Sequence, residues 1–208
     1  MKKANIFLNG EITEKEIIYK YIDNNDLFIA ADNGVTNLEN VGIEPDLVIG
    51  DLDSLPQKSL DNMDKSKILK DINQNFSDIQ KCLKFVHKKK IKNVNFFNFY
   101  GKRKDHAHCN ILSLLEYVEI INFKIIDNYG LTTFLKPGNN TFSFEIGKTV
   151  SLYSFNSVNQ LTLSGFKYEL TKKSFHNSFI GLSNKTQLSK QIVYFTKGYL
   201  IMYVPHNI

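Results

Sequence analysis

The sequence predicts an α/β domain with a mostly parallel sheet, followed by a small all-β sandwich. In residues 1–127, short apolar runs alternate with helix-like segments, which is typical of parallel strands covered by helices on both faces. From residue 128 onward, strand-sized apolar runs follow one another with only turn signals between them. A chain of 208 residues can hold two such domains, so we expect their boundary between residues 127 and 128.

Six apolar runs are the expected strands of the first domain: 5–8, 27–31, 47–50, 67–69, 94–100 and 123–127. Thr13 and Glu16 form a capping-box pattern, which predicts a helix over about 14–23. Ser77 is the expected N-cap of a second helix, and four residues of that helix predict one buried face: Ile79, Cys82, Leu83 and Val86. A third helix is expected within 105–120, where apolar residues recur at helical spacing.

The second domain is expected to be an antiparallel module, a small sandwich or barrel. Its predicted strands are 131–135, 141–146, 149–155, 160–166, 192–196 and 199–204. Turn signals separate these runs, among them Pro137-Gly138, Gly147, Gly165 and Gly198.

The cysteines and the amino terminus bear on the compartment. Cys82 and Cys109 lack metal-ligand spacing and lie in helix-like runs, so we expect buried thiols in a reducing environment. The apolar run before Gly10 is too short for a signal peptide, and we expect no membrane span. These features predict a cytoplasmic protein.

The net charge of +5 is unevenly distributed. Residues 1–127 hold 18 basic and 19 acidic side chains, whereas residues 128–208 hold 8 and 2. This thin spread does not predict a nucleic-acid partner. The densest run, HKKKIKN at 87–93, ends a helix-like stretch, where the helix dipole favours cations; we prefer this explanation to a phosphate-backbone site. Against 25 lysines, Arg103 is the single arginine, which indicates a need for its planar, bidentate fork.

Polar clusters follow four of the predicted strands, where ligands bind in open α/β sheets. The clusters are ADNGVTN with Asp32, Asn33, Gly34 and Asn37; GDLDS with Asp51, Asp53 and Ser54; DINQNFSD with Asp71, Gln74, Ser77 and Asp78; and GKRKDHAHCN with Arg103, Asp105 and His106. Each cluster alone is explained by turn and cap chemistry. Together they predict an acidic rim that needs a counter-ion.

The spacing of the acids favours a hard metal. Asp51 and Asp53 can aim two carboxylates at one point, and Asp78 could add a third. Mg²⁺ takes such oxygen ligands together with substrate phosphates, which Arg103 could meet. The sequence contains no P-loop, no protein-kinase motif set and no G-x-S-x-G, so a different kind of phosphate site is expected.

Several ordered segments resemble the thiamine pyrophosphokinase family. ADNGVTNL, GIEPD and GDLDS resemble its A-D-G-G-x-x-x-L, G-I-x-P-D and G-D-x-D-S segments. NFSDIQKCL resembles T-D-x-x-K-A-L, GKRKDHAHCN resembles G-x-R-x-D-H-x-x-x-N, and GFKYEL and GLSN resemble G-L-K-Y-x-L and G-x-S-N. Asn33, Ser77 and Lys104 depart from the family pattern, where a glycine, a threonine and an apolar residue are usual.

The resemblance implies transfer of pyrophosphate from ATP to the thiamine hydroxyl, giving thiamine diphosphate and AMP. It implies an ATP- and Mg²⁺-binding first domain, a thiamine-binding second domain, and a homodimer with active sites at the subunit interface. The implied Mg²⁺ ligands are Asp51, Asp53 and Asp78, while Arg103 and Asp105 would orient phosphates. The implied nucleotide-cleft residues are Asp32, Asn33, Gly34, Asn37, Gln74, Ser77 and His106, and the implied thiamine contacts are Gln74, Ser183 and Asn184.

Two residue roles stay open at this point. A carboxylate near the thiamine hydroxyl could take its proton, and both Asp71 and Asp78 are candidates. The chain has no tryptophan to stack on thiamine, and the aromatic candidates are Phe166, Tyr168, Tyr194 and Tyr199.

Three other functions are compatible with parts of the pattern. A related Mg–ATP diphosphotransferase could act on another hydroxymethyl heterocycle, such as a pterin. A non-catalytic protein could bind thiamine or nucleotide, although the joint presence of five polar site residues opposes this: Asp51, Asp53, Asp78, Arg103 and Asp105. A nucleic-acid-binding protein, suggested only by the isoelectric point near 9.0, would show steeply salt-dependent binding.

Overall fold

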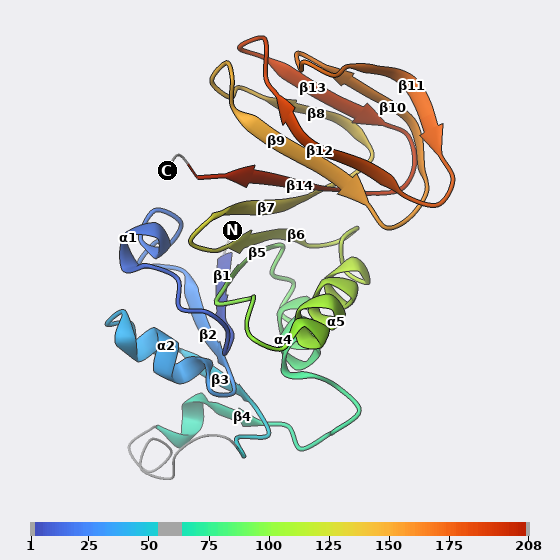
Figure 1. Ribbon diagram of the computed structural model, residues 1–208. Coiled ribbons are helices and arrows are strands. Elements are labelled where there is room, and N and C mark those ends of the chain that lie inside the picture. Colours follow the sequence, from blue (N-terminus) through green and yellow to red (C-terminus); the bar gives the residue numbers. More distant parts are fainter. Residues whose placement is uncertain (1–2, 54–63, 207–208) are drawn as a thin grey trace. The chain divides into compact units, whose positions relative to one another are not determined.

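The computed structural model describes residues 3–53 and 64–206 (Figure 1). The chain divides into two compact units, residues 1–128 and 129–208, which are described separately below. Among the helices of the described residues, none is long and apolar enough to cross a membrane.

The first unit is built on a parallel sheet. Its strands are β1 (Lys3–Phe7), β2 (Leu27–Ala31), β3 (Leu47–Gly50), β4 (Ile68–Lys70), β5 (Asn93–Phe97) and β6 (Asn122–Ile126). Their order across the sheet is β6-β5-β1-β2-β3-β4, and every neighbouring pair is parallel. The strand order reverses at β1, which in open α/β sheets marks the crevice where ligands bind.

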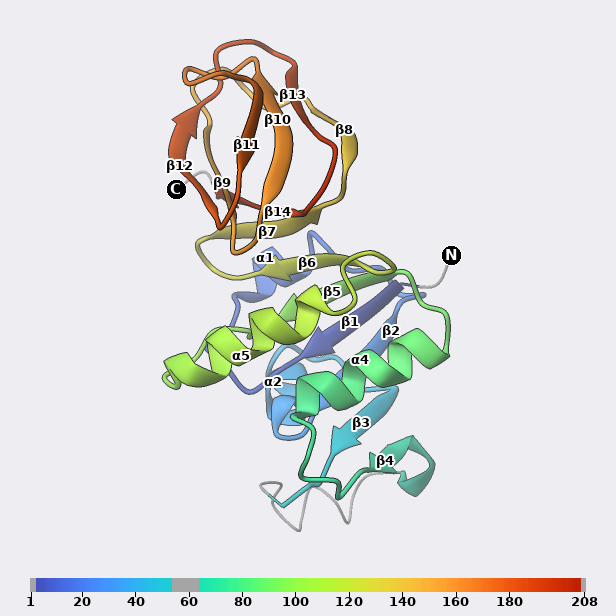
Figure 2. The same cartoon turned by 90° about the vertical axis from the view of Figure 1, so that its right-hand side faces the viewer.

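Helices lie on both faces of this sheet (Figures 1 and 2). They are α1 (Lys15–Ile18), α2 (Gly34–Asn40), α4 (Asp78–Lys88) and α5 (Lys104–Leu115), with a 3₁₀ turn at Lys65–Lys67. Figure 2 shows α4 and α5 together on one face, with α2 on the other. The predicted apolar face of α4 is confirmed, because Ile79, Cys82, Leu83 and Val86 are all buried.

Two expectations for the first helices are wrong. The helix expected over 14–23 is one short turn, and the Thr13 side chain does not cap it. Thr13 is instead buried, and its Oγ1 donates to the Ile126 carbonyl at 3.5 Å, so a long-range contact displaces the local capping pattern. The predicted polar cluster at 31–37 overlaps the start of α2, which spans residues 34–40.

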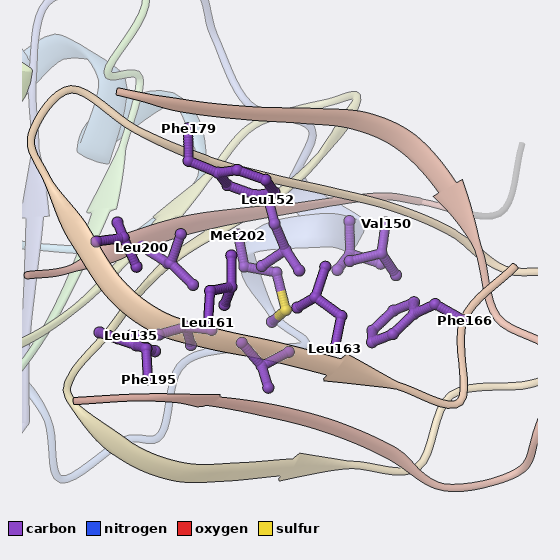
Figure 3. Close-up of a cluster of buried hydrophobic side chains, with 13 residues drawn as sticks. Leu135, Val150, Leu152, Leu161, Leu163, Phe166, Phe179, Phe195, Leu200 and Met202 are labelled. Atoms are coloured by element: carbon purple, nitrogen blue, oxygen red, sulfur yellow. The ribbon is translucent and has the colours of Figure 1, made fainter. Parts of the chain in front are cut away.

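The second unit is a sandwich of two antiparallel sheets. Its strands are β7 (Gly130–Leu135), β8 (Gly138–Phe142), β9 (Thr149–Ser154), β10 (Val158–Ser164), β11 (Leu170–Phe175), β12 (Phe179–Lys185), β13 (Gln191–Phe195) and β14 (Leu200–Pro205). One sheet has the order β12-β9-β14-β7 and the other β11-β10-β13-β8. Side chains from both sheets, among them Leu152, Leu161, Leu163 and Met202, meet in one buried core (Figure 3). The predicted fold class of a parallel α/β unit and a β-sandwich is confirmed.

Two strands of the sandwich escape the sequence pattern. The segments 170–175 and 179–185 are polar or mixed, and most of their residues are exposed. They are the edge strands β11 and β12 of the two sheets, which explains why they lack a continuous apolar run. Conversely, the strand expected over 141–146 ends at Phe142, and Ile146 is exposed.

The two thiols differ in environment. Cys82 is fully buried in α4, and burial raises the pKa of its thiol well above the usual range. Cys109 is exposed on α5, so the expectation of two buried thiols holds only for Cys82.

Candidate active site

Three strands of the parallel sheet end in residues with left-handed backbone. Asp32 follows β2 with φ of 47°, Leu52 follows β3 with φ of 68°, and Asn98 follows β5 with φ of 54°. Asparagine and aspartate tolerate this conformation, whereas for leucine it is a genuine outlier. Strained backbone of this kind gathers at functional sites. The carboxyl edge of the sheet therefore has the strained backbone that is typical of a functional site.

The segment between β2 and α2 is anchored to the end of β1. A Cβ on Gly34 would lie 2.1 Å from the Phe7 carbonyl oxygen, so only glycine allows α2 to begin there. The buried Asn37 side chain donates through Nδ2 to the Leu8 carbonyl at 2.8 Å, and Asn33 Nδ2 lies 3.4 Å from Asn9 Oδ1. These three predicted site residues thus fix the backbone at the carboxyl edge.

Asp51 accepts two hydrogen bonds at this edge. Gln74 Nε2 donates to its Oδ2 at 2.9 Å, and the Asp53 backbone N–H donates to its Oδ1 at 3.3 Å. The Gln74 bond, helped by that backbone bond and by Lys81, holds the pKa of Asp51 below its ordinary value. Asp51 is therefore an ionised oxygen donor, and the structure brings it together with Gln74 and Asp53.

Asp78 opens α4 beside a buried lysine. Lys81 Nζ lies 3.3 Å from Asp78 Oδ1, and the side chain of Lys81 is 3% exposed. Burial raises the pKa of Asp78, with the charges of Asp32 and Asp51 adding to the rise and Lys81 opposing it. The charges of Asp32, Asp51 and Lys81 thus act on Asp78, and these four residues are called the charged cluster below.

The carboxylates do not form a ready metal cage. Within residues 3–53 and 64–206, no three His, Cys, Asp or Glu side chains converge closely enough to hold an ion. Asp53 is exposed, and Ser54 of the same motif lies outside the described residues. Asp71 accepts the Asn73 backbone N–H at 3.0 Å, and its own N–H donates to the Gly50 carbonyl at 2.8 Å, so both candidate proton acceptors belong to the carboxyl edge.

Arg103 and Asp105 form their own ion pair. Arg103 Nε donates to Asp105 Oδ1 at 2.9 Å, and Nη2 donates to Oδ2 at 2.6 Å, with both side chains mostly exposed. Arg103 holds the pKa of Asp105 well below its usual range. The pair precedes and opens α5, where His106 is also exposed. The lone arginine thus uses its bidentate fork, as its rarity predicts.

Ser77 serves the helix rather than the cluster. It forms a capping box with Gln80, whose Oε1 accepts the Ser77 backbone N–H at 3.0 Å. The predicted N-cap of α4 is confirmed, and the cap fixes the helix turn that carries Asp78 and Lys81.

In the second unit, the GLSN segment contains a bulge of β12. Ser183 is exposed with φ of 53°, and its backbone N–H donates to Ser151 Oγ at 2.9 Å. The buried Asn184 uses its Oδ1 to accept the Tyr168 N–H at 3.0 Å and its Nδ2 to donate to the Tyr168 carbonyl at 2.8 Å. Asn184 therefore positions Tyr168, whose side chain is 65% exposed.

Lys81 is a site residue without a predicted role, although NFSDIQKCL places it at the lysine of the T-D-x-x-K-A-L pattern. Its signal is its position three residues after Asp78 on a predicted helix, a spacing that brings opposite charges together. Its neighbours Ile79, Cys82 and Leu83 are buried, but the sequence does not predict that the lysine side chain is buried with them.

Residues 18–125 match the family "Thiamin pyrophosphokinase, catalytic domain", and residues 139–200 match "Thiamin pyrophosphokinase, vitamin B1 binding domain". The chain belongs to the thiamin pyrophosphokinase family. The first match contains the whole Asp32–Asp51–Asp78–Lys81 cluster, and the second contains Tyr168 and the GLSN segment.

Full-length relatives agree with this membership. The thiamine pyrophosphokinase of Bacillus subtilis (strain 168) is 28% identical over 214 residues, covering 97% of this chain and 98% of the relative. A crystal structure of thiamine pyrophosphokinase from Bacillus subtilis matches with a TM-score of 0.87 at 26% identity, covering all of both chains. The structure from Candida albicans shares the fold, with a TM-score of 0.81 at 18% identity over 99% of this chain and 89% of that one.

The membership confirms the predicted family and enzyme class. The chain carries a thiamin pyrophosphokinase catalytic domain and a vitamin B1 binding domain, and the family implies ATP as a substrate. The presence of the second domain favours thiamine over a pterin as the acceptor class.

Proposed function

We propose that the chain transfers the pyrophosphoryl group of Mg–ATP to the hydroxyl of thiamine, giving thiamine diphosphate and AMP. The observation that carries this proposal is the charged cluster of Asp32, Asp51, Asp78 and Lys81 at the carboxyl edge of the parallel sheet, inside the region that matches the family's catalytic domain. Attack on a phosphorus of ATP requires positioning and charge neutralisation rather than a covalent enzyme intermediate.

The donor set of the cluster fits Mg²⁺. Asp51 is an ionised carboxylate, and Mg²⁺ commonly uses one or two carboxylates together with waters and substrate phosphates. The lack of a three-acid cage in the described residues agrees with a metal that is completed by the nucleotide. We assign the metal to Asp51 and Asp53, with Asp78 as the third oxygen donor, although these three side chains do not converge in the described residues. The ion would neutralise phosphate charge.

The chain's own residues supply the remaining positioning. Gln74 holds the Asp51 carboxylate, and Lys81 compensates the buried charge of Asp78 and contributes a cation next to the phosphates. In this proposal, the nucleotide lies between this cluster and the turn after β2, which contains Asp32, Asn33, Gly34 and Asn37. His106 and Asp105, at the start of α5, complete the cleft. Ser77 fixes the start of α4. Ser183 contributes to the thiamine site beside Tyr168.

The proposed reaction is tested by AMP release. The full-length protein with Mg–ATP is expected to release AMP when thiamine is present, and removal of divalent metal with EDTA is expected to abolish the release. Restoration by added MgCl₂ distinguishes metal removal from damage to the protein. AMP release with a hydroxymethylpterin but not with thiamine would contradict the acceptor, and release without any metal would contradict the role of Mg²⁺.

Replacement of Arg103 by lysine is expected to lower kcat/KM at least about tenfold, because lysine keeps the charge but loses the bidentate fork. The fork now engages Asp105, and we propose that it turns to phosphate oxygens when ATP binds. Steady-state kinetics with varied ATP measure the effect. Lys102→Arg is the control in the same loop and is expected to leave activity unchanged. Normal kinetics of the Arg103→Lys variant would refute the requirement for a fork.

Tyr168→Ala is expected to raise the KM for thiamine about tenfold, whereas Tyr168→Phe should keep it near normal. Of the four candidate aromatics, Phe166 and Tyr199 are buried in the sandwich, while Tyr168 is 65% exposed and held by Asn184. Tyr194, 37% exposed, provides the control, and Tyr194→Ala should not change the KM. An opposite ranking of the two alanine variants would transfer the stacking role to Tyr194.

We also propose that the chain forms a homodimer with active sites at the subunit interface. The edge strand β12 exposes Ile180 and Leu182, which are 72% and 64% exposed, although apolar edge strands are normally protected. A second copy of the chain is the proposed cover. Analytical ultracentrifugation should show a dimer, and the Ile180→Lys/Leu182→Lys variant should shift it toward monomer. A monomeric parent protein at micromolar concentration would overturn the proposal.

A further inference from the structure

A cavity of about 510 Å³ lies at the edge of the parallel sheet where the strands begin. Leu27 and Leu47, which line it, are the first residues of β2 and β3, and Ile91 precedes β5. The cluster of Asp51 and Asp78 follows the opposite ends of the strands, so the cavity belongs to a different edge. Its volume lies in the usual range of small-molecule sites.

The wall of the cavity is apolar and aromatic. Leu27, Leu47 and Phe85 are partly exposed into it, and Ile91 is buried behind it. Phe85 is a residue of α4. Its side chain also lies near a cation, because Lys89 Nζ is 5.8 Å from the centre of its ring. Such a wall suits a flat ring rather than a fully hydrated ion.

The rim of the cavity is basic. Lys89, Lys90 and Lys92 line it and are all exposed, whereas Asp46 is its single acid. One oxygen of Asp46 is already engaged, because Oδ2 accepts the Phe28 backbone N–H at 2.8 Å. The three lysines belong to the dense basic run at 87–93, which the proposed pyrophosphoryl transfer does not use. The dipole of α4 explains why cations are tolerated there, but it does not explain the cavity they surround.

The backbone holds this run in a specific shape. The Lys90 N–H donates to the His87 carbonyl and the Ile91 N–H to the Val86 carbonyl, both at 2.9 Å, and Lys90 has φ of 57°. This is the helix ending in which glycine is the usual left-handed residue. A lysine in this left-handed conformation costs conformational energy. With this helix ending, Lys89, Lys90 and Lys92 all line the same cavity.

We propose that this cavity binds a phosphate monoester of an aromatic or heterocyclic ring. The ring would lie against Phe85, Leu27 and Leu47, and the doubly charged phosphate would be held by the lysines as point charges. A dianion is favoured over a monoanion because three cations face one carboxylate. The site is distinct from the proposed pyrophosphoryl-transfer site and does not rest on that function.

Titration of the full chain with phenyl phosphate, followed by ¹⁵N–¹H NMR, tests the proposal. Amide shifts are expected at Leu47, Ile91 and Lys92, with binding tighter than that of inorganic phosphate and weakened by salt. The Lys89→Gln/Lys92→Gln variant should weaken binding at least about tenfold. The Lys20→Gln/Lys88→Gln variant removes the same charge from exposed lysines that do not line the cavity, and it should leave binding within about twofold of the parent.

Several outcomes would overturn the site. Equal binding of phenyl phosphate and inorganic phosphate would remove the role of the apolar wall. Equal weakening of binding by the two double variants would show that net charge, and not the lysines of the cavity, controls the affinity. Shifts confined to the surroundings of Asp51 and Arg103 would place the ligand in the candidate active site. Absence of shifts at millimolar phenyl phosphate would show that the cavity does not bind this class of ligand.

Discussion

Replacement of Asp51 by asparagine is expected to lower turnover at least about 100-fold while leaving the fold intact. Asp51, a member of the charged cluster, is kept ionised by Gln74 and by the Asp53 backbone N–H. Asparagine preserves the size and one acceptor oxygen but removes the charge that a hard cation needs. AMP release in the presence of thiamine and saturating Mg–ATP measures the loss.

The matched control is Glu39→Gln, which removes one negative charge from an exposed position of α2 without touching the cluster. It should leave turnover unchanged, which separates a local charge effect from a change in net charge. Both variants should keep the circular dichroism spectrum and melting temperature of the parent. A folded Asp51→Asn protein with near-normal turnover would show that the metal assignment is wrong.

The architecture of the first unit follows from patterns that are local in sequence. Buried parallel strands appear as apolar runs, and α4 carries its buried face at helical spacing behind Ser77. The failures come where distant contacts decide. Thr13 contacts the Ile126 carbonyl instead of capping its own helix, and the edge strands β11 and β12 carry too few buried residues to produce an alternating pattern.

The candidate site is only partly visible in the sequence. The parallel sheet predicts that Asp32, Asp51 and Asp78 share one edge, and the structure places their charges close enough to influence one another. The sequence predicts the capping role of Ser77, but it does not reveal that Asn37 is used by the backbone or that Asn184 is committed to Tyr168. Residue type and spacing predict what a side chain can bind, but three-dimensional contacts decide which partner it takes.

Lys81 is a further side chain whose role is decided by its three-dimensional contacts. A lysine on the apolar face of a helix is unexpected unless it has a buried partner. Lys81→Met keeps the length and apolar stem of the side chain but removes the ammonium group that pairs with Asp78 at 3.3 Å. Turnover is expected to fall at least about 100-fold, since the cluster loses a cation whose charge acts on both Asp51 and Asp78.

Stability should fall as well, by about 2 kcal/mol, because Asp78 is left without its counter-charge. This is less than the loss expected for a fully buried pair, since the Asp78 side chain is 38% exposed and water screens its charge. Chemical denaturation measures the change. In the Lys81→Met/Asp78→Asn double variant, the removal of the uncompensated carboxylate should restore most of the stability but none of the turnover. Recovery of neither property would mean that Lys81 acts by packing alone, whereas full activity of the single variant would exclude it from the proposed phosphate site.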